Sequence, residues 1–512
     1  MKIVNTATMK ELDRRTIEEA GVSGEELMER AGTGIARVAE EWRILGGLSA
    51  MSARLLAGGG NNGGDAFVAA RVLRGMDWEV EVWATRPAGD YGGETAAHLR
   101  RMLDAGVPLR ELTREEDWDE AERTAEPVDL LIDGLLGTGT KGAARGLPAR
   151  AIRYLNAQRR TTMVLAIDIP SGMNGDTGEA EGVAVVADLT VTMALPKAGL
   201  LRPRAAAHTG RLDVVDIGIP ASYVDEAAGE EGLEFVGRED IASVFPPPRP
   251  RAAQKGDFGK LLLVGGAVGM SGALVMAGRA ALRGGAGLVT LRVPPEAYTA
   301  AAAAAPELMI HPSPEGGDWG LGLYDVLLIG PGLGRSEESR LQVHHLLAER
   351  TGTAVVDADA LHVLAGEPER IDGTRAATVI TPHPGEAAKL LGCAPADIQQ
   401  DRRAAARELA GRSGAVCILK GAGTLIARPD GALAVNMNGN PGMATGGSGD
   451  VLAGLLAALL GQGLDPWDAA RAGVFLHGRA GDLAAAGQGE ISATAPDLIE
   501  ELPAALREFT PR

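Results

Sequence analysis

The sequence predicts an α/β protein in which each half of the chain builds a parallel sheet covered by helices on both faces. Short, almost continuously apolar runs alternate with helical patterns in both halves, and each run ends in glycine or a polar turn. Strands that are buried on both faces have this composition, because helices pack on both sides of a parallel sheet. Strand–turn–helix alternation is the pattern of βαβ units.

The predicted elements can be placed in chain order. The N-terminal half opens with helical stretches over 8–20 and 24–41, and further helices are predicted over 66–73 and 95–103. Apolar runs predict N-terminal strands at 54–57, 80–84, 130–132 and 163–167. In the C-terminal half they predict strands at 261–264, 288–291, 326–329, 354–356, 378–380 and 416–419. The alanine run 300–305 predicts a helix surface.

A proline-rich segment separates the two halves. Prolines at 246, 247, 248 and 250 favour extended backbone, which neither a helix nor a central strand accommodates. We therefore expect an N-terminal domain over 1–236, a linker region over 237–256 and a C-terminal domain over 257–512. A proline-rich surface loop inside a single domain is the alternative interpretation.

Charge and composition argue against nucleic-acid and membrane binding. The 50 basic and 68 acidic residues give a formal net charge of −18, which repels phosphate backbones and anionic lipids. The longest aliphatic run, 451–460, is half of the roughly 20 residues that cross a bilayer, and the charged N-terminus lacks a signal-peptide pattern. The 2 cysteines fit neither a disulfide framework nor zinc spacing. We expect a cytoplasmic homo-oligomer without nucleic-acid or membrane partners.

Glycine-rich loops after the predicted strands are the candidate ligand sites. Glycine supplies 71 of the 512 residues, and ligands of open parallel sheets bind beyond the carboxyl ends of the strands. Both Gly58–Gly63 and Gly137–Gly142 fit GxGxxG, a weak fingerprint at this glycine content. No acidic residue follows the run 79–84, which disfavours an ordinary Rossmann dehydrogenase, and the P-loop pattern is absent.

The most informative loop is NPGMATGGSGD, residues 440–450, which precedes an apolar helical run. Thr445–Gly449 can present backbone N–H groups at a helix N-terminus, an arrangement that holds phosphate charge. Asp450 can then take a proton from a hydroxyl group that attacks a phosphoryl group. The alternative is that Asp450 only caps the helix.

Two further loops follow predicted strands. Lys420–Thr424 places a lysine and glycines where a nucleotide phosphate could approach, or it forms only a hairpin turn into 425–428. His383, between two prolines, could bond a ligand hydroxyl or amide, or the prolines could serve only to fix a turn.

The ordered motifs resemble the bifunctional NAD(P)H-hydrate repair enzymes, in which an NAD(P)HX epimerase is fused to an ADP- or ATP-dependent (S)-NAD(P)HX dehydratase. The N-terminal half resembles the epimerase, or YjeF N-terminal, family through LMERAG (27–32), GNNGGD (60–65), DGLLGTG (133–139) and DIPSG (168–172). The C-terminal half resembles the dehydratase through KGDFGK (255–260), GMSGA (269–273), GPGLG (330–334), TPHPGE (381–386), KGAGT (420–424) and TGGSGD (445–450). The resemblance implies a Rossmann-like three-layer αβα domain followed by a ribokinase-like αβα domain.

In the N-terminal half the resemblance also implies site residues. Asp168 would contact the hydrated ring as acid and base, whereas strand-end turn formation is the alternative for Asp133 and Asp168. A potassium ion would be ligated by Asn62, Asp133 and Ser171, whose oxygens suit a large hard cation. The dinucleotide would be bound by Asn61, Asn62, Gly63, Gly64, Asp65, Gly137, Thr138, Gly139, Thr140, Lys141, Gly142 and Ala143.

In the C-terminal half the resemblance implies a site for NAD(P)HX lined by Ala273, Gly332, His383 and Asp450. ADP or ATP, with Mg²⁺, would be bound by Lys420, Gly421, Ala422, Gly423, Thr424 and Gly449. With Asp450 as the base, the ring hydroxyl would be phosphorylated and phosphate eliminated, and ADP is the donor that single-chain fusions of this family favour. The nearest alternative is a ribokinase-like small-molecule kinase with a non-catalytic dinucleotide-binding N-terminal module.

Overall fold

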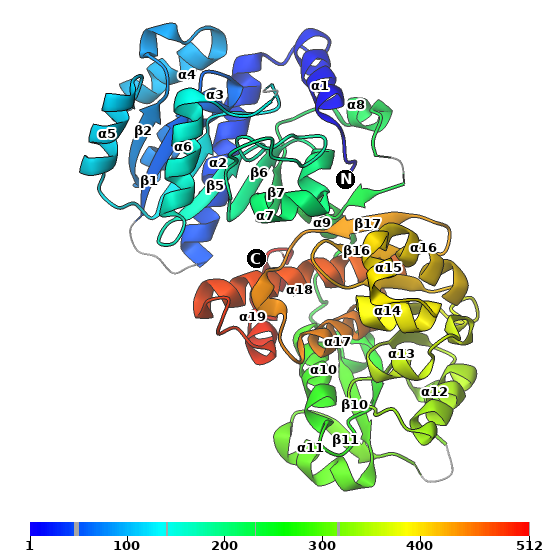
Figure 1. The fold of residues 1–512 in the computed structure, drawn as a ribbon. Helices are drawn as coiled ribbons and strands as arrows, with labels where there is room; N and C mark the ends of the chain where they lie inside the picture. Colours follow the sequence, from blue (N-terminus) through cyan, green and yellow to red (C-terminus); the bar gives the residue numbers. More distant parts are fainter. Residues whose placement is uncertain (46–50, 140–141, 231, 315–317, 511–512) are drawn as a thin grey trace. The chain divides into compact units, whose positions relative to one another are not determined.

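The computed structural model describes residues 1–45, 51–139, 142–230, 232–314 and 318–510. The chain forms two compact units, Met1–Glu231 and Gly232–Arg512 (Figure 1). Residues 232–236, expected in the N-terminal domain, belong to the second unit, because strand β8 (Glu234–Phe235) pairs there with β17 (Leu433–Asn436). Burial of Phe235 and Val236 explains this placement. The expected linker, 237–256, contains helix α9 (Arg238–Val244) and reaches into the short helix η4 (Lys255–Phe258).

The described strands of the first unit form a parallel sheet in the order β3-β2-β1-β4-β5-β6-β7. The four strands predicted from apolar runs are confirmed, whereas β3, β6 and β7 were not predicted. Because β1 lies between β2 and β4, the sheet has its switch point there, where ligands of such sheets bind. The strands are β1 (Ser52–Ala57), β2 (Glu79–Ala84), β3 (Leu109–Glu111), β4 (Leu130–Gly134), β5 (Met163–Ile167), β6 (Leu189–Met193) and β7 (Arg211–Val215).

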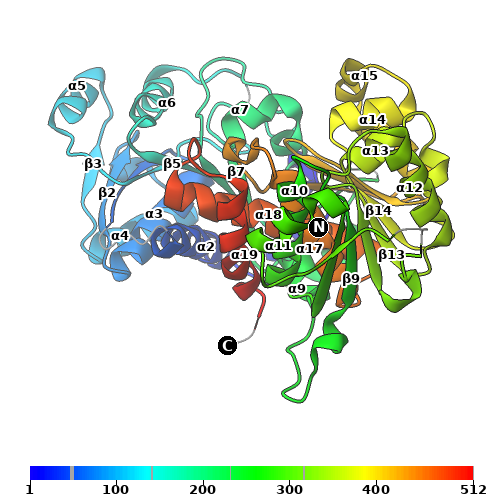
Figure 2. The same cartoon turned by 90° about the horizontal axis from the view of Figure 1, so that it is seen from below.

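Helices cover both faces of this sheet, as predicted (Figure 2). One face packs against α2 (Gly24–Leu45), α3 (Asn61–Gly75) and α4 (Gly93–Asp104). The other packs against α5 (Glu115–Thr124) and α6 (Gly146–Gln158), where Trp83, Trp118 and Tyr154 contact one another. The remaining described helices are α1 (Thr6–Glu18), α7 (Ala206–Thr209), α8 (Ala221–Glu226), η1 (Ala88–Asp90), η2 (Ala198–Leu201) and η3 (Pro203–Ala205).

The second unit's sheet is mixed: the predicted strands pair in parallel, as expected, and an antiparallel strand that was not predicted lies beside them. Its order among the described strands is β11-β10-β9-β12-β13-β14-β15-β16-β17-β8. Strand β16 runs antiparallel to β15 and β17, because its connections are too short for a crossover. All six predicted strands are confirmed. The strands are β9 (Lys260–Val264), β10 (Leu288–Val293), β11 (Met309–Pro312), β12 (Val326–Ile329), β13 (Thr353–Val356), β14 (Thr378–Ile380), β15 (Val416–Leu419), β16 (Thr424–Ala427) and β17.

One face of this sheet packs against α10 (Ser271–Arg283), α17 (Ser448–Gly461), α18 (Pro466–Gln488) and α19 (Ala495–Arg507). Helices α12 (Glu337–Glu349), α13 (Asp359–Val363), α14 (Pro384–Leu391), α15 (Pro395–Gln400) and α16 (Arg402–Ser413) lie on the other side (Figure 1). The alanine run forms α11 (Tyr298–Ala304), although Ala301 is buried instead of lying on the surface. Short helices are η5 (Pro295–Ala297), η6 (Leu321–Leu323), η7 (Pro368–Ile371) and η8 (Pro441–Met443).

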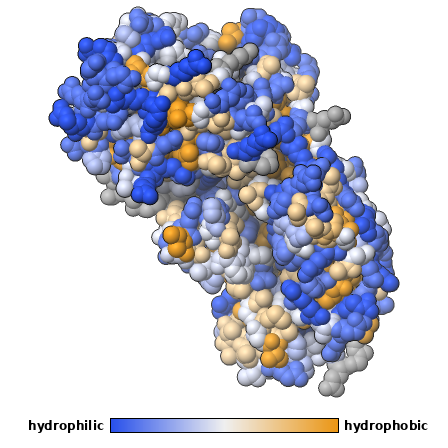
Figure 3. Space-filling view, in the orientation of Figure 1, coloured by the Kyte–Doolittle hydropathy of each residue, from blue (hydrophilic) through white to orange (hydrophobic). Residues whose placement is uncertain are grey.

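The helices and the surface can be compared with what a membrane-spanning segment would require. In the described ranges, no helix combines the length and the apolar character that a membrane span needs. The face drawn in Figure 3 is largely hydrophilic, with hydrophobic residues scattered over it. The apolar run that the sequence analysis noted is α17, whose residues from Val451 to Leu460 are buried in the core.

Candidate functional sites

The first site centres on Asp168, which directly follows β5. Its φ of 66° is a left-handed conformation that few residues other than glycine adopt. Asp168 Oδ1 accepts hydrogen bonds from Lys197 Nζ at 2.6 Å and Thr192 Oγ1 at 3.0 Å, and 10% of the Asp168 side chain stays exposed. Lys197 Nζ also donates to Thr192 Oγ1 at 3.0 Å and to the Met193 carbonyl at 2.9 Å. These acceptors use all three protons of the buried ammonium and fix the carboxylate of Asp168.

Two further carboxyl groups lie near this ion pair, Asp13 of α1 and Asp65 of α3. Burial raises the pKa of Asp13 to about 6, with Lys197 opposing the rise and Asp168 adding to it. Burial, reinforced by the charges of Asp168 and Asp13, raises the pKa of Asp65 well above its ordinary value. The cluster therefore combines an ion-paired carboxylate with two carboxyl groups whose raised pKa values favour the protonated form, the combination that acid–base catalysis uses.

The three expected potassium ligands, Asn62, Asp133 and Ser171, come from different segments, and Ser171 links the other two. Asn62 Nδ2 donates to the Leu136 carbonyl at 3.1 Å, and Ser171 Oγ lies 3.2 Å from the same oxygen. Ser171 Oγ donates to Asp133 Oδ1 at 2.6 Å, and the Ser171 amide donates to Asp133 Oδ2 at 2.8 Å. Burial raises the pKa of Asp133 to about 6. Asp133 also accepts from the Leu135 amide, so it shapes the strand-end turn as well.

The glycines of the first unit's loops are required by close approaches. A Cβ on Gly137 would lie 2.3 Å from Asn62 Oδ1, and one on Gly63 would lie 2.0 Å from the Gly58 carbonyl oxygen. Asn61 begins α3, so the amides of 61–64 form the first turn of a helix. A narrow pocket beside this turn is lined by Leu136, Gly137, Gly142, Gly172, Met173, Asn174, Glu179 and Glu181.

The other expected dinucleotide-binding residues lie along the same loops. Gly64 packs against Met28, and Ala143 lies against Gly182. Thr138 and Gly139 continue the loop after Gly137, whereas Thr140 and Lys141 lie outside the described residues.

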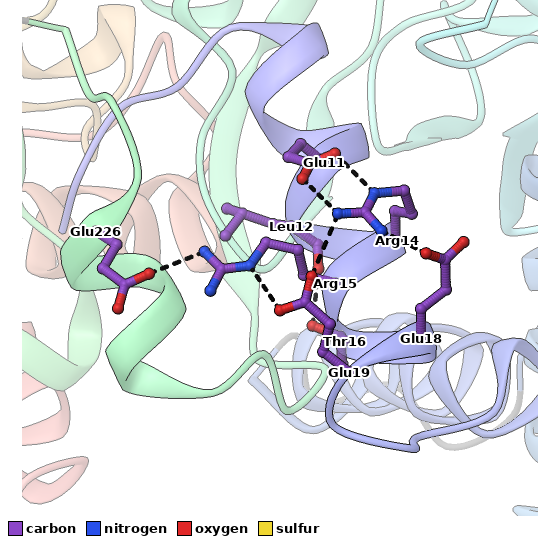
Figure 4. Close-up of polar contacts among 8 residues, drawn as sticks. All are labelled: Glu11, Leu12, Arg14, Arg15, Thr16, Glu18, Glu19 and Glu226. Atoms are coloured by element: carbon purple, nitrogen blue, oxygen red, sulfur yellow. Dashed lines mark hydrogen bonds and ion pairs between the residues drawn. The ribbon is translucent and has the colours of Figure 1, made fainter.

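A separate surface pocket of about 400 Å³ lies between α1 and α8 and contains none of the expected site residues. Figure 4 shows the polar contacts of this region: Arg15, which lines the pocket, pairs with Glu226 at 3.0 Å and with Glu19 at 3.2 Å. Arg14 pairs with Glu11 at 2.7 Å. Since carboxylates neutralise both arginines, this pocket offers little attraction to a phosphate group.

The second site forms around Asp450 at the start of α17. The N-cap of α17 is Gly447, with φ of 96°, and Asp450 is the third residue of the helix. The alternative that Asp450 is merely the N-cap is therefore wrong. Burial and the charge of Asp357 raise the pKa of Asp450 to about 7, although Lys420 opposes the rise.

Lys420 lies between this helix terminus and two further carboxylates. Its Nζ donates to Asp357 Oδ1 at 2.9 Å and lies 4.0 Å from Glu386 Oε2. A Cβ on Gly449 would be 3.3 Å from the same Nζ. Asp357 also accepts from Thr381 Oγ1 at 2.6 Å, and burial raises the pKa of Glu386 to about 7 despite the opposing charge of Lys420. The loops after β13, β14 and β15 thus meet the first turn of α17.

The loop that carries Lys420 is the hairpin turn between β15 and β16, so the hairpin interpretation of Lys420–Thr424 is confirmed, and nucleotide binding by this loop stays a prediction. Gly421 and Gly423 have φ of 138° and 61°, which favour glycine. Thr424 Oγ1 donates to the Gly421 carbonyl at 2.9 Å, and the Ala422 carbonyl accepts from Arg402. The turn therefore presents Lys420 from a fixed backbone.

His383 is the N-cap of α14, and its Nδ1 accepts from the amides of Gly385 at 3.0 Å and Glu386 at 3.3 Å. Its Nε2 lies 3.4 Å from Glu386 Oε1, and 56% of the side chain is exposed. The capping interpretation is confirmed for Nδ1, and ligand binding by His383 stays a prediction. Gly332 and Ala273 are neighbours, because a Cβ on Gly332 would lie 3.3 Å from the Ala273 Cβ.

Sequence reasoning missed Asp13 and Lys197 in the first unit and Asp357 and Glu386 in the second. Asp357 directly follows the predicted strand 354–356, so the strand-end rule could have found it. Nothing in the sequence distinguishes Asp13 from the other charged residues of α1. In the described chain, no group of three or more His, Cys, Asp and Glu side chains is arranged to hold a metal ion.

Comparison with known proteins gives one family match within each of the two units. Residues 24–199 match the family described as YjeF-related protein N-terminus, and residues 261–504 match the NAD(P)H-hydrate dehydratase family. A crystal structure of the ADP/ATP-dependent NAD(P)H-hydrate dehydratase from Bacillus subtilis, co-crystallised with ATP/Mg²⁺, is 29% identical with a TM-score of 0.49. The match covers 55% of this chain and 100% of that chain.

Two relatives match over almost their whole length, and both are named bifunctional NAD(P)H-hydrate repair enzymes. The one from Moorella thermoacetica is 40% identical, with 99% of this chain and 97% of the relative covered. The one from Escherichia coli K12 is 38% identical, with 96% of this chain and 91% of the relative covered. The chain therefore belongs to the family of bifunctional NAD(P)H-hydrate repair enzymes.

Proposed function

We propose that this chain repairs hydrated NAD(P)H. The first unit interconverts (R)- and (S)-NAD(P)HX, and the second unit dehydrates (S)-NAD(P)HX to NAD(P)H at the expense of ADP or ATP. The observation that carries the proposal is the second site, where Asp450 and Lys420 meet at a glycine-lined helix N-terminus. Relatives that bear this name and match nearly the whole chain support both halves of the proposal.

In the second unit, the amides of the first turn of α17 and the ammonium of Lys420 attract the terminal phosphate of the nucleotide. Asp450 takes the proton of the ring hydroxyl, whose oxygen attacks the terminal phosphorus atom while the bond to the bridging oxygen breaks. The ring nitrogen then pushes out phosphate, and the ring loses a proton. With ADP, one NAD(P)HX yields NAD(P)H, AMP and inorganic phosphate.

The oxygen atoms near Lys420 also fit a magnesium ion that arrives with the nucleotide. Mg²⁺ prefers oxygen ligands and is usually held by one or two carboxylates together with substrate phosphates. Asp357, Glu386 and Asp450 supply such carboxylates, and a ready-made three-ligand cage is absent from the described residues. When bound, Mg²⁺ would neutralise negative charge that develops on the transferred phosphoryl group.

In the first unit, Asp168 transfers a proton to and from the hydrated ring while the hydroxyl-bearing carbon inverts. The reaction consumes no second substrate, because the bond at the hydroxyl-bearing carbon that breaks on one face of the ring forms again on the other face. Lys197 holds the carboxylate of Asp168 in place, and the neighbouring Asp65 and Asp13, whose pKa values burial raises, supply protons. The amides at the start of α3 attract the pyrophosphate.

A potassium ion suits the group formed by Asn62, Asp133 and Ser171. Asn62 and Ser171 contact the Leu136 carbonyl and Asp133 accepts from Ser171, and all three side chains carry oxygen atoms of the kind that a large hard cation takes. The buried Asp133 carboxylate, whose pKa burial raises to about 6, gains a positive partner there. When bound, K⁺ would offset the negative charge of the pyrophosphate.

The proposal is tested by incubating the enzyme with hydrated NADH and either ADP or ATP. We expect the absorbance of reduced nicotinamide to return, with one terminal phosphate released for each NADH formed. A stable phosphorylated product without that absorbance would favour the alternative, a small-molecule kinase with a non-catalytic N-terminal module. Cytoplasmic location, homo-oligomeric state and the lack of nucleic-acid or membrane partners stay predictions.

A further inference from the structure

His477 of α18 is a buried histidine that contacts Ser448, the first residue of α17, and has no part in the chemistry above. His477 is 9% exposed. Its Nε2 lies 2.9 Å from the Ser448 carbonyl oxygen and 3.4 Å from Ser448 Oγ. A carbonyl oxygen can only accept, so Nε2 carries the proton. Burial lowers the pKa of His477 to about 4, so the ring is neutral near pH 7.

The Ser448 carbonyl that His477 contacts belongs to the same peptide unit as the Gly449 amide. The carbonyl of Ser448 and the N–H of Gly449 share one planar trans peptide unit and point in opposite directions. Gly449 faces Lys420, since a Cβ at Gly449 would lie 3.3 Å from Lys420 Nζ. Holding the Ser448 oxygen therefore fixes the direction of the Gly449 N–H beside the lysine that attracts phosphate.

Helix α18 also holds the other end of the same segment. Asp482 Oδ2 accepts from the Gly439 amide at 3.2 Å, and Asp482 Oδ1 accepts from Asn440 Nδ2 at 3.1 Å. Asn440 Oδ1 in turn accepts from the Gly442 amide at 3.0 Å. One helix thus fixes both ends of 439–449, with His477 at the end that faces the reacting groups.

We propose that His477 is a positioning residue of the dehydratase site, whose Nε2–H fixes the Ser448–Gly449 peptide so that the Gly449 amide meets the terminal phosphate of the nucleotide. The inference rests on the proposed dehydratase function. It gives the buried His477 a role in holding the loop, whereas packing in the core would otherwise be its only role.

The test compares variants that keep or remove the donor. His477→Phe keeps a planar ring without an N–H, whereas His477→Gln places an amide N–H near the position of Nε2. His98→Phe is the matched control, because His98 is a fully buried histidine whose Nε2 lies 3.1 Å from the Glu25 carbonyl in the first unit. ADP affinity is measured by calorimetry on the full chain, together with kcat and KM for ADP.

We expect His477→Phe to weaken ADP binding about 5- to 10-fold, the effect of losing one hydrogen bond of ordinary strength. The KM for ADP rises in parallel, His477→Gln stays within about 3-fold of the wild type, and His98→Phe does not change ADP affinity. Wild-type affinity in a folded His477→Phe variant would overturn the proposal, as would equal losses in the Phe and Gln variants.

If His477→Phe does not fold, His477→Gln and His477→Asn decide, because the shorter asparagine amide does not reach the position of Nε2. We then expect Asn to weaken binding and Gln to preserve it, and equal affinities would overturn the proposal. Calorimetry separates this inference from the proposed function. A wild type that binds ADP without dehydrating NAD(P)HX refutes the function and leaves the binding comparison valid, whereas one that binds no ADP refutes both.

Discussion

Asp450 carries a partly buried carboxyl group in the first turn of α17, next to Lys420. Replacing Asp450 with Asn removes the proposed base but keeps the shape of the side chain and the loop amides. We expect dehydratase turnover to fall by about 10²–10⁴, the scale of general-base removal, while ADP affinity changes little. Asp430→Asn, an exposed carboxylate that pairs with Arg428 beyond β16, is the control. Near-normal turnover in Asp450→Asn would assign the proton transfer to another group.

The neighbours of Asp450 give a pH dependence with a definite sign. Burial first, and then the charge of Asp357, raise the pKa of Asp450 to about 7. The base must be ionised, so kcat/KM for (S)-NAD(P)HX, which reports the free enzyme, should rise with pH and level off above about 7. Asp357→Asn removes a negative neighbour, which favours ionisation, and therefore shifts the rising limb to lower pH.

The measurement is the pH profile of kcat/KM for the wild type and the variants. Asp359→Asn is the matched control, because Asp359 also raises the pKa of Asp450 but contributes less than Asp357. We expect a smaller shift in the same direction for this variant. A rising limb that moves to higher pH in Asp357→Asn would contradict the assignment of Asp450 as the titrating base.

Lys197 and Asp168 form a buried ion pair, with side chains that are 2% and 10% exposed. Lys197→Met leaves the carboxylate without its cation, so we expect the free energy of unfolding to fall by about 3–5 kcal/mol. Arg159→Met, which breaks an exposed pair with Asp188, should cost no more than about 1 kcal/mol. Urea unfolding measures both. If Lys197→Met costs no more than Arg159→Met, the buried pair does not stabilise the first unit.

At the scale of elements, the conformation of the loop before α17 requires a glycine at Gly447 but not at Gly446. Gly447 has φ of 96°, and a Cβ there would lie 2.5 Å from Met276 Cε, whereas a Cβ on Gly446 meets open space. Gly447→Ala should lower the free energy of unfolding by about 1–2 kcal/mol for the left-handed conformation alone and weaken ADP binding. Gly446→Ala should stay within about 0.5 kcal/mol of the wild type. Equal stabilities of the two variants would contradict this local geometry.

Apolar runs predicted the central strands because those strands are buried on both faces. Residues 261–264 and 326–329 belong to such strands, β9 and β12, and are fully enclosed. Strand β6 was missed because Thr190 and Thr192 interrupt its apolar residues, although both are buried. Thr190 Oγ1 satisfies its burial by donating to the Thr209 carbonyl at 2.7 Å, a partner that no local pattern shows.

The same limit applies to the sites. Asp133, Asp168 and Lys420 each follow a strand predicted from the sequence, so a rule about strand ends could locate them. Lys197 reaches Asp168 only through the packing of the segment after β6, 29 positions further along the chain. Whether a loop glycine or a carboxylate acts in catalysis depends on such tertiary neighbours, and for that reason the roles of the site residues stay predictions.

At the scale of the whole molecule, each proposed active site draws its residues from one compact unit. Asp168, Lys197 and Asp65 belong to the first unit, and Asp450, Lys420 and Asp357 belong to the second. Neither site needs a side chain of the other, so the coupling between the two reactions is the hydrated dinucleotide itself. A variant that disables one site should therefore leave the chemistry of the other intact.

This independence predicts how variants act on a mixture of both epimers. The wild type should convert the whole mixture to NAD(P)H in the presence of ADP, whereas Asp168→Asn should stop once (S)-NAD(P)HX is consumed. Because the released epimer diffuses, adding Asp450→Asn protein, whose epimerase site is intact, should restore complete conversion by Asp168→Asn. The return of nicotinamide absorbance gives both endpoints. An endpoint that the added protein does not raise would mean that the two sites work only within one chain.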